Sequence, residues 1–196
     1  MPERIDHTFD PVVRRGHDFR YHLAAGFCLP GDIVLDAACG TGYGSEIVNS
    51  RRDLTYVGVD KLDDFESDGD ATFISADLRT WTPSFEFDVA ISFETIEHLT
   101  DYHHFIDVLK RARRWVLASV PVIPTTHINE FHAQDFAPSQ LASVLGDEWW
   151  LFQMLSQPTE FSEIYVWKRT QGRRGKVRPG RKLGGEIRGS TSGFPG

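Results

Sequence analysis

Acidic residues and glycines follow an apolar segment near the start of the chain, in a pattern suited to holding a ligand. Residues 33–35 (Ile-Val-Leu) favour a strand that is buried on both faces, and Asp36 comes directly after them. Gly40, Gly42 and Gly44 then allow the backbone to approach a bound molecule closely. We therefore interpret this stretch as a strand-to-loop turn that binds a ligand.

The charge of Asp36 limits which ligand this turn would accept. A glycine loop between a strand and a helix is also typical of nicotinamide dinucleotide sites, where the pyrophosphate lies at the helix N-terminus. Ser45 stands where that pattern has its third Gly or Ala, and Asp36 would place a negative charge beside the pyrophosphate. A ligand that lacks phosphates and carries positive charge fits better.

Further acids stand at the ends of the next predicted strands. Asp60 ends the segment 56–59 and follows Gly40 by 20 residues, so it is suited to accept hydrogen bonds from both ribose hydroxyls of an adenosine-bearing ligand. Asp77 follows the segment 71–75, where it could also cap the next turn.

The segment 34–42, Val-Leu-Asp-Ala-Ala-Cys-Gly-Thr-Gly, resembles the first motif of class I S-adenosylmethionine (SAM) dependent methyltransferases. The resemblance implies that SAM is the cofactor, that Asp36 and the glycine loop hold its methionine part, and that Asp77 and Leu78 lie at its adenine. On this resemblance the predicted cofactor-binding residues are Asp36, Ala38, Gly40, Gly42, Asp60, Lys61, Asp77, Leu78, Phe93 and Glu94.

Three histidines are candidates for a general base. Transfer of a methyl group to a hydroxyl requires that the hydroxyl lose its proton, and imidazole is suited to accept it. His98, His127 and His132 fall on predicted loops at the edge of the sheet where ligands bind, and we name them as candidate catalytic residues. The alternative is a helix-start residue for His98 and a surface loop for the other two.

A second interpretation of the same region is a metal site. On one helical turn Glu94, Glu97 and His98 would share a face, with His127 or His132 as a further ligand. This run resembles the metal site of Hen1-type small-RNA 2′-O-methyltransferases. It is also similar to methyltransferases of quinones and glycans that use no metal, and we predict no metal; the alternative set is Glu94, Glu97, His98 and His132.

The loop 121–136 resembles the segment after the fifth strand in glycan-associated methyltransferases, where a Pro is followed by a His and a Phe. We therefore predict an enzyme that methylates a hydroxyl of a small-molecule or glycan-like acceptor. Two alternatives stay open: a metal-assisted RNA 2′-O-methyltransferase, and a SAM-binding protein without catalysis.

The elements that must position these residues alternate between strands and helices. Strands are expected at 33–35, 56–59, 71–75, 87–93, 115–121, 149–155 and 163–167, and helices at 17–27, 101–113 and 138–145. In the resembling family a helix here covers the SAM pocket, so Arg15, His17 and Tyr21 are either cofactor contacts or surface residues of an amphipathic helix. The order predicts an α/β fold with a doubly wound, Rossmann-like, seven-stranded, mostly parallel sheet that ends in an antiparallel strand pair.

Composition and charge divide the chain into three parts. We predict an N-terminal arm at 1–16, a methyltransferase domain at 17–170 and a basic, glycine-rich, disordered tail at 171–196. Residues 1–167 carry 12 Lys and Arg against 27 Asp and Glu, whereas residues 168–196 carry 9 against 1. The tail could contact nucleic acid, but the acidic body disfavours such a partner.

The chain lacks a long apolar run, and its two cysteines, Cys28 and Cys39, have neither a disulfide framework nor metal-ligand spacing. We therefore expect a cytoplasmic protein with no membrane partner.

Overall fold

The computed structural model describes residues 11–50, 53–65 and 71–170. They form a seven-stranded sheet with the order β3-β2-β1-β4-β5-β7-β6. The pairs among β1 to β5 are parallel, and β7 is antiparallel to both β5 and β6. The predicted fold class is confirmed. The strands are β1 (Ile33–Ala37), β2 (Thr55–Asp60), β3 (Thr72–Ser75), β4 (Val89–Phe93), β5 (Trp115–Pro121), β6 (Trp149–Gln157) and β7 (Ser162–Arg169).

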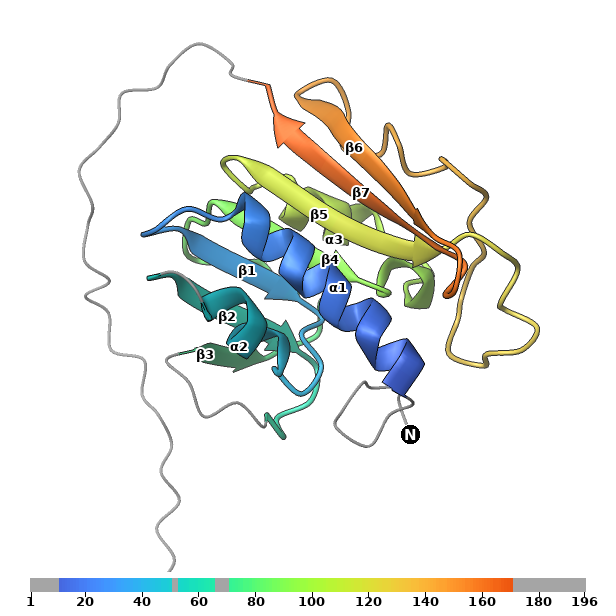
Figure 1. Cartoon of the computed structure of the whole chain (residues 1–196), viewed down its shortest axis with the longest axis horizontal. Coiled ribbons are helices and arrows are strands. Elements are labelled where there is room, and N and C mark those ends of the chain that lie inside the picture. Colours follow the sequence, from blue (N-terminus) through green and yellow to red (C-terminus); the bar gives the residue numbers. More distant parts are fainter. Residues whose placement is uncertain (1–10, 51–52, 66–70, 171–196) are drawn as a thin grey trace, which may run out of the picture.

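Helices cover both faces of the sheet (Figure 1). On one face α1 (Pro11–Phe27) and α2 (Gly44–Asn49) bury a core that includes Tyr21 and Val48. On the other face α3 (His103–Leu109) buries a separate core that includes Phe105 and Leu109. The inner strands are therefore buried on both sides, which explains their nearly continuous apolar sequences.

The strand order changes direction at β1, which pairs with β2 on one side and with β4 on the other. Asp36 is in register with Gly58 of β2 and Ile91 of β4. The loops that follow β1 and β4 therefore leave the same edge of the sheet and diverge. In open α/β sheets this point is where ligands bind.

Several predicted helices have different bounds in the structure. The first helix, Pro11–Phe27, includes residues 11–16 of the range predicted as an arm. The helix predicted at 101–113 is confined to His103–Leu109, since the chain leaves it to pair the Arg113 amide with the Phe87 carbonyl.

The helix predicted at 138–145 is wrong. This segment forms a series of turns, in which the Ala142 amide bonds to the Ser139 carbonyl and the Val144 amide to the Leu141 carbonyl. Ser139 has a φ of 64°, a left-handed conformation that a continuous α-helix excludes. Residues 1–10 of the arm predicted at 1–16, and the tail predicted at 171–196, lie outside the described residues.

Two glycines give opposite predictions for replacement by alanine. A Cβ at Gly44, the first residue of α2, would lie 2.3 Å from the ring of Tyr21, whereas one at Gly26 of α1 would meet nothing within 4 Å. Gly44→Ala should therefore lower the free energy of unfolding by about 1–3 kcal/mol through overpacking. Gly26→Ala should raise it by about 0.4–1 kcal/mol, because alanine restricts the unfolded chain. Urea unfolding of both variants measures the difference; equal effects would contradict the close contact between α1 and α2.

Candidate active site

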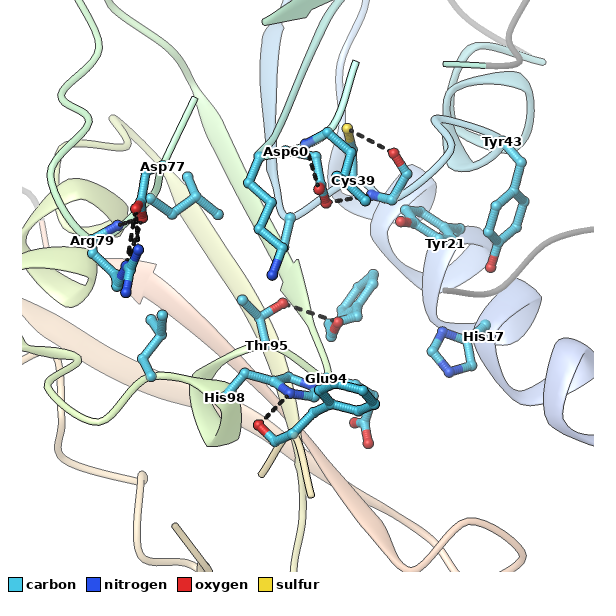
Figure 2. Close-up of a pocket in the computed structure, with 18 residues that line it drawn as sticks. His17, Tyr21, Cys39, Tyr43, Asp60, Asp77, Arg79, Glu94, Thr95 and His98 are labelled. Carbon is cyan, nitrogen blue, oxygen red and sulfur yellow. Dashed lines mark hydrogen bonds and ion pairs between the residues drawn. The ribbon is translucent and has the colours of Figure 1, made fainter. Parts of the chain in front are cut away.

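A cavity of about 340 Å³ opens at the carboxyl ends of β1, β2 and β4 (Figure 2). One wall is formed by α1, and another by the segment that follows β4. Of the residues predicted from the sequence, the cavity is lined by Ala38, Gly40, Asp60, Lys61, Asp77, Leu78, Phe93, Glu94 and His98. The structure thus brings together residues that are as much as 60 positions apart in the chain.

The glycine loop has two functions in this geometry. Gly40 has a φ of 59°, lines the cavity, and has open space where a Cβ would lie. Gly42 has a φ of 89° and does not line the cavity. A Cβ there would lie 2.5 Å from the ring of Phe73. Gly40 therefore leaves room for a ligand, whereas Gly42 permits the loop to pack on β3.

Asp36 lies beneath the glycine loop and does not line the cavity. It is 1% exposed and accepts a hydrogen bond from the hydroxyl of Tyr56. Burial raises the pKa of Asp36 to about 7, although hydrogen bonds from Tyr56 and Tyr21 oppose this shift. Tyr21 lines the cavity and is also a hydrogen-bond partner of Asp36, so this side chain connects the buried carboxyl group to the cavity wall.

Asp60 and Asp77 both line the cavity, with different partners. Asp60 accepts a hydrogen bond of 3.0 Å from the Gly40 amide, which fixes the glycine loop against the end of β2. Asp77 forms a bidentate ion pair with the Arg79 guanidinium and accepts a hydrogen bond of 2.9 Å from the Arg79 backbone amide. The hydrogen bonds from Arg79 lower the pKa of Asp77 to about 2. Asp77 therefore stabilises the turn after β3, the alternative that the sequence had left open.

Glu94 follows β4 in a strained conformation, with a φ of 51°. Its carboxylate accepts hydrogen bonds from the hydroxyls of Ser119, at 2.6 Å, and Ser162, at 3.0 Å. The next turn is a 3₁₀ helix, η1 (Ile96–His98), which does not include Glu94. The prediction that Glu94, Glu97 and His98 share one helical face is therefore wrong for Glu94.

Glu97, His98 and His132 do come together. Their ligand atoms all lie within 4.8 Å of one another, and the two imidazole rings are 4.7 Å apart between centroids. His132 is held by a contact of 2.6 Å between its Nδ1 and the Thr125 hydroxyl. This group contains three of the four residues of the alternative metal set. His127 is exposed and belongs neither to this group nor to the cavity lining.

His98 lines the cavity, and one nitrogen of its ring is fixed by a hydrogen bond. Its Nδ1 lies 3.0 Å from the carbonyl oxygen of Phe131. A carbonyl oxygen only accepts hydrogen bonds, so Nδ1 carries the proton and the lone pair of the neutral ring is on Nε2.

The helix α1 contributes side chains that the sequence pattern left undecided. His17 and Tyr21 both line the cavity, one helical turn apart. Burial and the nearby charge of Arg20 lower the pKa of His17 to about 3, so its ring is neutral. Seven further lining residues were not predicted as site residues: Cys39, Tyr43, Leu62, Arg79, Thr95, Leu99 and Phe131.

The chain is similar in sequence to known methyltransferases. Residues 35–115 match the family described as "Methyltransferase domain". A probable S-adenosylmethionine-dependent methyltransferase of Mycolicibacterium smegmatis is 29% identical over 148 residues, which is 67% of this chain and 56% of that protein. One of Mycobacterium tuberculosis is 29% identical over 147 residues, covering 68% and 53%. The chain thus spans about half the length of the relatives that it matches.

Solved structures share the fold at low sequence identity. The N-methyltransferase NodS from Bradyrhizobium japonicum, in complex with S-adenosyl-L-homocysteine (SAH), has a TM-score of 0.65 at 11% identity, covering 84% of this chain and 90% of that one. The small RNA methyltransferase HEN1 has 0.64 at 15%, covering 91% and 28%. The [4+2]-cyclase SpnF has 0.66 at 11%, covering 86% and 85%. The chain has the class I methyltransferase fold, and the resemblance predicted from its motifs is confirmed.

Among the described helices, none has the length and apolar character needed to cross a membrane.

The raised pKa of Asp36 predicts how stability depends on pH. The folded protein holds a proton on Asp36 up to about pH 7, whereas the unfolded chain releases it near the ordinary value of 3.8. Stability should therefore fall as pH rises between about 4 and 7, by about 4 kcal/mol for this group. Urea midpoints from pH 4.5 to 7.5 should show this loss in the wild type and not in Asp36→Asn.

Asp77→Asn is the control for this measurement. The pKa of Asp77 is lowered to about 2, so its contribution is lost only as pH falls below its ordinary value. This variant should keep the slope of the wild type above pH 4.5. A slope unchanged in Asp36→Asn would contradict the protonated state of Asp36.

Proposed function

We propose that this chain is a SAM-dependent methyltransferase domain that methylates a hydroxyl of a small-molecule or glycan-like acceptor. The observation that carries the proposal is the orientation of His98, which lines a cavity at the point where the strand order of the sheet changes direction. Its Nδ1 donates to the Phe131 carbonyl, so its Nε2 has the lone pair that can accept a proton. The similarity to SAM-dependent methyltransferases supports the choice of cofactor.

The residues of the cavity fit SAM in their chemistry. Open space beside Gly40 admits a ligand against the backbone of the loop. Asp60 accepts hydrogen bonds from the Gly40 amide through one oxygen and from the Leu62 amide, at 3.3 Å, through the other. Each carboxylate oxygen can accept more than one hydrogen bond, which suits the pair to the hydroxyls of a ribose. The apolar side chains of Leu78 and Phe93 would contact uncharged parts of the cofactor, while Tyr21 would lie near its charged end above Asp36.

SAM supplies an electrophilic methyl group when it is bound. In transfer to a hydroxyl, the bond from sulfur to the methyl carbon breaks, a bond from oxygen to that carbon forms, and the hydroxyl proton must leave. His98 is the histidine of the three predicted candidates that lines the cavity, so we assign it the acceptance of this proton at Nε2. Phe131 orients the ring and forms part of the wall beside it.

Binding and turnover give separate tests of the cofactor and the base. Calorimetry should show SAM binding to the wild type and an affinity lower by about tenfold in Asp60→Asn, because one charged acceptor is lost. Formation of SAH should be measured with pools of hydroxylated small molecules and oligosaccharides. His98→Gln should keep the SAM affinity and lose turnover by about 10²–10⁴-fold.

Asp107→Asn, a change at an exposed residue of α3 that does not line the cavity, should alter neither quantity. Undiminished SAM affinity in Asp60→Asn would contradict the binding assignment. Tight SAM binding with no SAH formed from any pool would favour the non-catalytic alternative.

The group of Glu97, His98 and His132 favours a second candidate function, a metal-assisted RNA 2′-O-methyltransferase. One carboxylate and two imidazoles within 4.8 Å can hold a divalent ion such as Mn²⁺. His98 would then bind the ion and could not serve as the base, so the two proposals exclude each other. The RNA methyltransferase HEN1 is among the structures that share the fold.

Metal titration decides between the two candidates. If the second is correct, Mn²⁺ added to chelator-treated protein should bind to the wild type, and Glu97→Gln and His132→Ala should each weaken binding by at least about tenfold. His127→Ala should bind as the wild type does, because His127 is exposed and lies outside the group. Turnover that is unaffected by EDTA, with no heat of Mn²⁺ binding, would remove this candidate.

A further inference from the structure

A buried ionic cluster joins α1 to the far end of the sheet beside the cavity. Arg20 of α1 is fully buried; its Nε donates to Gln157 at 2.6 Å and its Nη2 to Glu160 at 2.8 Å. Gln157 is the last residue of β6, and Glu160 lies in the turn between β6 and β7. Gln157 also donates to the Gly16 carbonyl at 3.2 Å, and a Cβ at Gly16 would lie 1.3 Å from a carboxylate oxygen of Glu160. The cluster is thus closely packed on both sides.

Glu94 is the member of this cluster that reaches the cavity. Its Oε1 lies 3.5 Å from Nη2 of Arg20, farther than the 2.8 Å between Arg20 and Glu160. The nearer partners of the Glu94 carboxylate are the hydroxyls of Ser119 and Ser162, which stabilise an ionised carboxylate without neutralising it. The guanidinium of Arg20 is therefore matched mainly with Glu160.

This pairing leaves a surplus of one negative charge. The cluster contains one guanidinium and two carboxylates, two of the three side chains being 0% and 10% exposed. Burial and the charge of Glu94 raise the pKa of Glu160, while Arg20 opposes the shift, as expected for a crowded anionic group. The formal charges of the other lining residues sum to zero, since Asp77 pairs with Arg79 and the remaining two are one carboxylate, Asp60, and one ammonium, Lys61.

We propose that the pairing of Arg20 with Glu160, neither of which lines the cavity, leaves the negative charge of Glu94 without a matching positive charge. The cavity then binds cationic SAM more tightly than neutral SAH. This inference rests on the proposed function. SAM carries a sulfonium, an ammonium and a carboxylate, for a net charge of +1, whereas SAH has lost the sulfonium charge and is neutral. Loss of the methyl group would then weaken binding of the product and assist its release. Glu160 is a specificity-determining residue that acts through Arg20 and Glu94.

The ratio of the SAM and SAH affinities tests this inference. In Glu160→Gln the amide still accepts a hydrogen bond from Arg20, but the guanidinium is released to neutralise Glu94. Calorimetry should show that the preference for SAM over SAH falls by about three- to tenfold, since one unit charge acts over a short distance in a partly dry site. A purely structural defect would weaken both ligands equally and leave the ratio unchanged.

Two further variants complete the experiment. Glu94→Gln removes the surplus charge directly and should lower the ratio at least as much, even if Glu160→Gln proves too unstable to measure. Glu148→Gln removes a carboxylate at the other end of β6, where Glu148 pairs with Arg169 at 3.3 Å, and should leave the ratio as in the wild type. A ratio unchanged in both Glu160→Gln and Glu94→Gln overturns the inference while the proposed cofactor stands. Failure of the wild type to bind either ligand overturns the proposed cofactor itself, and the inference with it.

Discussion

The pairing of β1 with β2 on one side and β4 on the other is the constraint on which the site depends. Parallel strands end at the same edge of a sheet, so this pairing brings Asp36, Asp60 and Glu94 to one edge. The loops after β1 and β4 must then diverge, and the cavity lies where they separate. Neither the glycine loop nor the turn after β4 could form this cavity alone.

Three carboxylates near this edge differ because their surroundings differ. Asp36 is buried beneath the loop, which raises its pKa to about 7. Asp77 is exposed enough to pair with Arg79, which lowers its pKa to about 2. Glu94 accepts hydrogen bonds from two serines. The same residue types therefore meet different partners and different degrees of burial around one cavity, and this decides which of them hold a proton.

The helix α1 connects this distribution to the rest of the molecule. Tyr21 contacts the cavity on one side and lies within hydrogen-bonding range of Asp36, while Arg20, the preceding residue, faces the turn between β6 and β7. A change in the cluster around Arg20 would therefore reach both the wall of the cavity and the last two strands. The carboxylate of Glu160 and the amide oxygen of Gln157 explain why a fully buried arginine is tolerated here, since both accept hydrogen bonds from its guanidinium.

Most of the sheet and much of the cofactor edge could be predicted from the sequence. Apolar runs that end in an acid or a glycine are local patterns, and they predicted each strand together with Asp60, Asp77 and the glycine loop. Helices were predicted less well. The segment 138–145 has helical spacing, yet its backbone forms turns, and Ser139 takes a left-handed conformation that a continuous helix excludes.

What only the tertiary structure decided is which polar side chains share a partner. The local pattern placed Glu94 with Glu97 and His98, but the strained backbone at Glu94 turns it to serines of β5 and β7, while His132 joins the other two from a distant loop. Arg20 and Glu160 are separated by 140 positions. The sequence by itself therefore determined the strands and the acids that end them, because both follow from local spacing. The fold determined their charge and their neighbours, because burial and long-range contacts arise only when distant segments pack together.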